Sequence, residues 1–148
     1  EMPSTPLTLS RTAVTLLLIV IVVEGIIGSQ VREITDEMAK AHLNVPRDSW
    51  REELEKSWLY LAHRSFSWAV LFAMIWAWLL AKRFRKGGPG KVERGAGLIV
   101  LAQMVLGVVM AQMHVFSWVQ VLHVGLAAVL LTLVWLWLFG LSGKREGC

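Results

Sequence analysis

Two histidines stand inside long apolar runs, where an imidazole is costly unless it is hydrogen-bonded or coordinates a metal. His63 lies five residues after Trp58, and His123 lies five residues after Trp118. Tryptophan is common at the edge of a membrane. At 1.5 Å per helical residue, both imidazoles are therefore expected about 7–8 Å below that edge. Two neutral imidazoles at equal depth on separate helices are what axial ligation of a haem iron requires.

A carboxylate is expected in the same layer of the membrane. Glu24 lies five residues before Ser29, in an apolar run that crosses in the opposite direction. We treat Glu24 as a candidate catalytic residue that would accept protons or stabilise developing positive charge. Two simpler interpretations stay open. Each histidine can serve as a hydrogen-bonding group between helices, and Glu24 can be a protonated anchor bonded to Gln103 or to a backbone carbonyl.

Four apolar blocks account for the composition. The 148 residues are 55% hydrophobic with a mean hydropathy of +0.55, whereas soluble domains are usually about 45–50% apolar. We expect an all-α integral membrane four-helix bundle, a single domain over residues 1–148. Its transmembrane helices are expected at about 12–29, 58–81, 96–113 and 118–139. No small-residue cleavage site follows the first block, so we expect a span there rather than a signal peptide.

Charge sets the expected topology. The loop over residues 82–94 carries six Lys or Arg and one acid, a pattern typical of cytoplasmic loops. Both termini are then cytoplasmic, and the protein is expected in the cell's inner (plasma) membrane. The same clustering makes nucleic acid an unsuitable partner. The extracytoplasmic segment over residues 30–57 should hold an amphipathic helix over residues 31–42 lying at the interface. A second helix, capped by Asp48 or Ser49, should lead into the second span.

The residues around the histidines suit a flat macrocycle. Small residues nearby allow close approach, Phe66 is expected to pack on the ring, and Arg64 and Arg32 are expected to pair with propionates. The expected haem-binding residues are His63, His123, Arg64, Arg32, Phe66 and Gln112, of which the two histidines would bind the iron. His42 and His114 are expected to be solvated at the outer interface. The one cysteine, Cys148, leaves no disulfide framework or CxxCH motif.

Three motifs occur in order along the chain: Gly28-Ser-Gln-Val-Arg-Glu33 followed by Asp36, then His63-Arg-Ser-Phe-Ser-Trp68, then Leu122-His123. Together they resemble the haem A synthase family of cytochrome oxidase assembly proteins. Most members have eight spans in two similar halves. This chain resembles one half over its whole length, most closely the C-terminal half. A weak internal repeat, with Glu24-Gly-Ile-Ile-Gly28 matching Gln103-Met-Val-Leu-Gly107, is consistent with two helical hairpins.

The resemblance implies a function. The family oxidises the C8 methyl of haem O to the formyl group of haem A. One half holds the substrate haem, and the other holds a haem b that passes electrons. Carried over here, His63 and His123 are the axial ligands, and the bound group is haem b, haem O or haem A. The implied partners are membrane lipid and a second copy or second four-helix half. Haem O synthase or oxidase subunits are further implied partners.

Two departures from the family pattern favour the haem b half. The catalytic half carries a glutamate one helical turn before its first histidine, and this sequence has Tyr60 there. The paired cysteines that many members carry in the first outer loop are also absent. A non-catalytic bis-histidine b-type cytochrome subunit of a membrane electron-transfer complex is the main alternative. An assembly factor that only carries haem is a further one.

Overall fold

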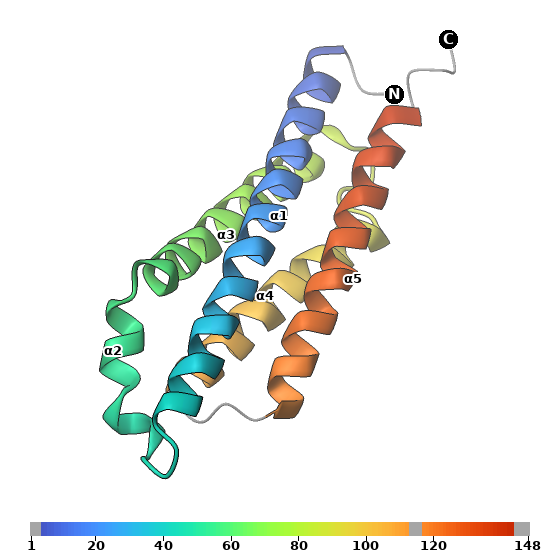
Figure 1. The fold of residues 1–148 in the computed structure, drawn as a ribbon. Coiled ribbons are helices and arrows are strands. Elements are labelled where there is room, and N and C mark those ends of the chain that lie inside the picture. The colour runs from blue at the N-terminus through green and yellow to red at the C-terminus, as the bar shows by residue number, and fades with distance from the viewer. Residues whose placement is uncertain (1–3, 113–116, 144–148) are drawn as a thin grey trace.

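The computed structural model describes residues 4–112 and 117–143, and in these residues it contains helices and no strands (Figure 1). Four helices are long and apolar enough to cross a membrane. They are α1 (Ser4–Ala41), α3 (Trp58–Phe84), α4 (Lys91–Gln112) and α5 (Ser117–Ser142). The short elements η1 (Arg47–Ser49) and α2 (Arg51–Lys56) lie between α1 and α3. The predicted all-α bundle of four membrane-spanning helices is thus confirmed.

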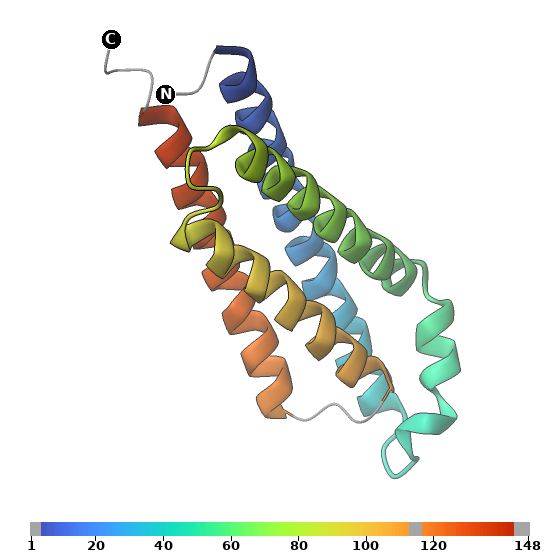
Figure 2. The same cartoon turned by 180° about the vertical axis from the view of Figure 1, so that it is seen from behind.

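The four long helices form a closed ring of neighbours. α1 packs against α3, α3 against α4, α4 against α5, and α5 against α1 (Figures 1 and 2). The helices α3 and α5 are therefore diagonal to each other, and so are α1 and α4. Since His63 belongs to α3 and His123 to α5, the histidines are carried by helices that face each other across the bundle axis.

The first helix is longer than the sequence pattern suggested. We expected a span ending near Ser29 and a separate amphipathic helix at the interface, but α1 continues unbroken to Ala41. Its 38 residues correspond to about 57 Å, well beyond a hydrocarbon core of about 30 Å. No Gly or Pro interrupts residues 29–41, so nothing ends the helix before the turn in which Asn44 takes a positive φ of 72°.

The connection from α1 to α3 also differs in detail. Neither Asp48 nor Ser49 caps the next helix, because both lie in η1 and the Ser49 hydroxyl donates to the Pro46 carbonyl instead. The helix α2 begins after Trp50 without a side-chain cap. It does not run directly into α3, because Ser57 has an extended backbone with ψ of 133°. Burial of Trp50 and Leu54 fixes this segment against the bundle.

The buried apolar core occupies only half of the bundle length. On α1 it ends at Ile21, on α3 it begins at Val70, and on α4 it ends at Val100. On α5 it extends from Leu130 to Leu141. We call the end of the bundle nearest this core the basic end, because it carries residues 82–94 with their six Lys or Arg. The opposite half contains Glu24, His63 and His123 and none of the residues of this core.

Polar contacts close the basic end. The Arg11 guanidinium of α1 donates to the Leu141 carbonyl at 2.8 and 3.2 Å and to the Ser142 carbonyl at 3.1 Å. These carbonyls end α5 without helical partners, so Arg11 caps the last helix from the first. In the α3–α4 loop, Arg85 pairs with the buried Glu93. The first and last helices are thereby joined where the core is densest.

Candidate functional site

The imidazole of His63 lies against the backbone of α1 at Gly28. A Cβ added to Gly28 would lie 3.1 Å from the His63 Cε1 atom and 3.4 Å from its Nδ1 atom. The first distance is shorter than nine in ten contacts made by real Cβ atoms. Glycine at position 28 is therefore what lets the ring approach α1 so closely. The Gly-x-Gln-Val-Arg-Glu motif thus begins with the glycine against which the His63 ring packs.

Glu24 lies one turn before Gly28 on α1 and faces the same imidazole. Its Oε1 atom is 3.0 Å from His63 Nδ1, and the two side chains are 16% and 26% exposed. The carboxylate lies away from the direction of the ring N–H, so this is a close polar contact and not a formed hydrogen bond. A small rotation of the ring would align the two groups. Because Nδ1 of His63 faces Glu24 on α1, Nε2 is the ring nitrogen that stays available to another partner.

A second side chain of α3 holds the same carboxylate. The Ser67 hydroxyl lies 2.5 Å from Glu24 Oε1 and 2.9 Å from the His63 carbonyl oxygen. One hydroxyl hydrogen can go to only one acceptor, and the closer, carboxylate oxygen is the stronger acceptor. Ser67 follows His63 by one helical turn, so both residues point to the same face of α3. Sequence reasoning missed Ser67, although its i+4 spacing from His63 was a usable signal.

His123 occupies the corresponding layer on α5. The Gln103 side chain of α4 donates through Nε2 to the His123 backbone carbonyl at 2.9 Å. His123 belongs to α5, the helix diagonal to the one that carries His63. The structure thus brings Glu24 and His63 together and carries His123 on the helix diagonal to that of His63. The alternative in which Glu24 binds Gln103 is wrong, because each of these residues bonds to a different histidine-bearing helix.

Several polar atoms in this layer are buried without a hydrogen-bonding partner. They are Glu24 Oε2, His63 Nδ1, Gln103 Oε1 and His123 Nδ1. Each of the four long helices contributes one of them. Buried polar groups without partners are rare and usually point to a ligand or ion. Four in one layer mark this part of the bundle as a candidate binding site.

The donor set of this layer can be compared with what a metal ion and a haem each require. No group of three or more His, Cys, Asp or Glu side chains in residues 4–112 and 117–143 is arranged to hold a metal ion. A porphyrin supplies four iron ligands itself, so a haem needs only two from the protein. The donors present therefore fit haem better than a protein-bound metal ion.

Three of the expected haem contacts are exposed. Arg64 and Phe66 lie on the exposed part of α3, and Arg32 lies 3.9 Å from Asp36 on α1. Exposed ion pairs of this kind contribute little to stability, so Arg32 remains available to an anionic group. Pairing of Arg64 and Arg32 with propionates stays a prediction. So does packing of Phe66 on the ring.

Gln112 lies at the end of α4, under the segment that joins α1 to α3. Arg51 of α2 donates to its side-chain oxygen at 3.2 Å, and Arg47 donates to the Met110 carbonyl at 3.3 Å. Burial lowers the pKa of the Arg47 guanidinium. These arginines bind the end of α4, where helical carbonyls lack partners. A haem contact for Gln112 stays a prediction, and its hydrogen bond to Arg51 gives it a structural role.

The other two histidines lie away from the layer or outside the described residues. The ring of His42 is half-buried, with Nδ1 2.9 Å from the Met38 carbonyl, and it stacks on Trp50 with 5.8 Å between ring centroids. It is therefore less solvated than expected. His114 lies outside the described residues. Tyr60, at the position of the family's catalytic glutamate, lies close enough to Arg47 and Arg51 to interact with both electrostatically.

The chain belongs to the COX15-CtaA family of cytochrome oxidase assembly proteins, whose family model matches residues 3–135. Membership confirms the resemblance that the motifs indicated. It implies a haem A synthase-type role in cytochrome oxidase assembly, and hence an involvement of haem. With four membrane-spanning helices, the chain is a multi-pass membrane protein. No curated protein and no solved structure matched the chain significantly.

The hydrogen bond between Ser67 and Glu24 predicts that replacing Ser67 destabilises the protein more than replacing Ser65 of the same motif. Ser67→Ala should lower the free energy of unfolding by about 1 kcal/mol, because it removes a partner of a buried carboxylate between two membrane helices. Ser65→Ala is the matched control, since the Ser65 hydroxyl is exposed and bonds only to the Leu61 carbonyl of its own helix. Unfolding in mixed detergent measures both. Equal losses in the two variants would show that the contact between helices contributes nothing.

Proposed function

We propose that this chain is a haem-binding membrane protein of the haem A synthase type, with His63 and His123 as the axial ligands. The observation that carries the proposal is the close contact of His63 with Glu24, with His123 carried by the diagonal helix. The departures at Tyr60 and at the missing cysteines favour the haem b half of the reaction. A bis-imidazole haem bound there would supply one-electron transfer.

The residues of the chain have separate tasks in this proposal. Gly28 lets the His63 ring lie against α1. Glu24 faces Nδ1 of that ring, which would leave Nε2 free to hold the haem iron and would make the imidazole a more basic ligand. Ser67 holds the carboxylate. Gln103 holds the α5 backbone at His123, which fixes the position from which the second imidazole projects.

Oxidation of the C8 methyl of haem O is the second candidate function. Glu24 Oε2 is buried and has no hydrogen-bonding partner, so this oxygen is the group in the layer best suited to accept a proton. In this reading Glu24 replaces the glutamate that the family's catalytic half carries at the position of Tyr60. Electrons would then leave through a second haem. A second copy of the chain or a second four-helix half would hold that haem.

The orientation and membrane follow the charge distribution. The basic end would face the cytoplasm and the segment with η1 and α2 would face outward, in the cell's inner (plasma) membrane. Trp58 and Trp118 are 73% and 66% exposed, as expected for side chains at the outer membrane edge. The histidine layer then lies toward the outer leaflet.

Identification of the extracted pigment tests the proposal. Purified protein should show Soret absorption, and acid extraction with mass spectrometry should find haem b. His63→Ala and His123→Ala should each lower the haem content at least fivefold, because each removes one of two iron ligands. His42→Ala is the control and should retain full haem content. Haem O or haem A in the extract would instead support the catalytic function, and well-folded protein without Soret absorption would refute both.

A proton-accepting role for Glu24 predicts a specific loss. Glu24→Gln keeps the size of the side chain and its ability to bond to Ser67, but it removes the basic oxygen. In cells that depend on this chain, haem A formation should fall at least tenfold while haem content of the purified variant changes little. Unchanged haem A formation would rule out the catalytic role. It would leave the ligand assignment standing, since that rests on the histidine variants.

A further inference from the structure

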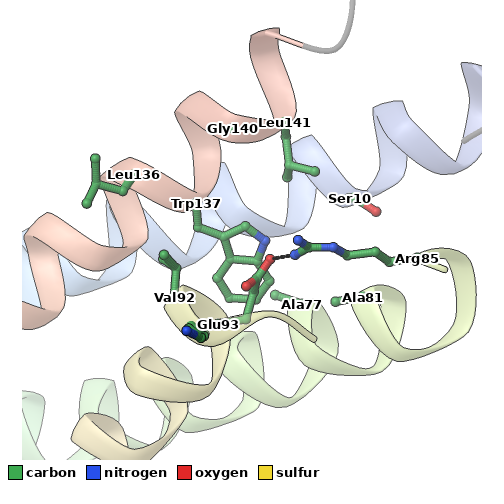
Figure 3. Close-up of a pocket in the computed structure, with 11 residues that line it drawn as sticks. Ser10, Ala77, Ala81, Arg85, Val92, Glu93, Leu136, Trp137, Gly140 and Leu141 are labelled. Atoms are coloured by element: carbon green, nitrogen blue, oxygen red, sulfur yellow. Dashed lines mark hydrogen bonds and ion pairs between the residues drawn. The ribbon is translucent and has the colours of Figure 1, made fainter. Parts of the chain in front are cut away.

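A pocket of about 210 Å³ lies at the basic end of the bundle, far from the histidine layer (Figure 3). It is formed where α1, the end of α3, the start of α4 and the end of α5 meet. Its polar lining residues are Ser10, Arg85, Lys91, Glu93 and Trp137. Nothing in the proposed function uses these residues, and the pocket's role is independent of haem.

The charge of the pocket suits an anion. Glu93 is 5% exposed, and its carboxylate is neutralised by Arg85, whose guanidinium faces it in Figure 3. Lys91 makes no ion pair among the described residues and therefore leaves the pocket with a net positive charge. Lys91 is also the first residue of α4. The free N–H groups and the positive end of that helix add to the attraction for an anion.

A buried hydroxyl in the pocket lacks a partner. Ser10 is 5% exposed, and its Oγ atom makes no hydrogen bond. Thr12, nearby on the same helix, bonds to the carbonyl of Thr8, so the local helix offers serine and threonine such a bond. In Figure 3 the Ser10 hydroxyl projects from α1 toward the side chain of Arg85. A buried hydroxyl held in this way is ready to donate to a bound ligand.

One wall of the pocket continues onto the surface that faces lipid. Leu136 lines the pocket and is itself 49% exposed on α5. Gly140, one turn later, also lines it, and an added Cβ there would meet nothing within 4 Å. A ligand in the pocket can therefore extend an apolar part along α5 without leaving the membrane. A soluble anion would make no use of this apolar path.

We propose that this pocket binds the phosphodiester head group of an anionic phospholipid from the leaflet at the basic end. Lys91 supplies the uncompensated charge, Ser10 supplies a buried donor, and the apolar path along Leu136 receives an acyl chain. Basic pockets between membrane helices on the cytoplasmic side are suited to such lipids. A bound lipid would also fill the junction of α1, α4 and α5 and so stabilise the closed basic end.

Native mass spectrometry of the protein in neutral detergent tests this site. After incubation with phosphatidylglycerol, one lipid per chain should stay bound, and phosphatidylcholine should be retained much less. Lys91→Gln should weaken retention about fivefold, since one cation near an anionic lipid contributes about 1 kcal/mol. Lys86→Gln is the matched control, because it removes the same charge at the same end of the bundle and Lys86 does not line the pocket. It should leave retention unchanged.

Ser10→Ala gives a second, independent variant. It removes a hydroxyl that has no partner in the protein, so it should fold normally and still retain less phosphatidylglycerol. Equal losses in Lys91→Gln and Lys86→Gln would overturn the proposal, because they would indicate unspecific attraction to a basic surface. Displacement of the lipid by millimolar inorganic phosphate would also overturn it, in favour of a soluble anion. Haem content should be the same in all three variants, which separates this site from the histidine layer.

Discussion

The approach of one imidazole to the backbone of α1 determines how the candidate site is built. His63 reaches Gly28 because no side chain is present there, and one turn earlier Glu24 meets its Nδ1 atom at 3.0 Å. In a bilayer neither group can turn to water, so partners for them must come from another helix or from a bound ligand. This contact fixes the rotation of α1 and α3 about their axes. Two further contacts join helices in this layer. Ser67 of α3 donates to Glu24 of α1, and Gln103 of α4 donates to the His123 carbonyl of α5.

The bundle divides stability and binding between its two halves. Toward the basic end, buried residues from all four long helices form one apolar core, and Arg11 joins the first helix to the last. In the other half this core is absent, and four polar atoms are buried without partners. Such a division allows one half to hold the helices in place while the other accepts a large flat ligand. The apolar core does not reach the end of α4. Hydrogen bonds from Arg47 and Arg51 hold that end instead.

Much of this arrangement could be predicted from sequence because a bilayer restricts the choices. Four apolar blocks require four helices, and tryptophans mark depth, so Glu24, His63 and His123 could be assigned to one layer. Partners within the layer could not be predicted, since they depend on helix rotation and on which neighbours touch. Gln103 was one alternative partner for Glu24, yet α1 and α4 lie on a diagonal, and Ser67 of α3 holds the carboxylate instead. The unbroken course of α1 to Ala41 was missed because amphipathic periodicity does not show where a helix joins the preceding one.

Haem retention in a pair of glycine variants tests most directly the claim that His63 is seated against α1. Gly28→Ala would place a methyl group 3.1 Å from the His63 Cε1 atom, whereas a methyl at Gly25 would meet nothing within 4 Å. Both variants should fold, because alanine favours a helix. The ratio of Soret absorbance to protein should fall at least fivefold in Gly28→Ala and stay at the wild-type value in Gly25→Ala. Equal ratios in the two variants would contradict the account.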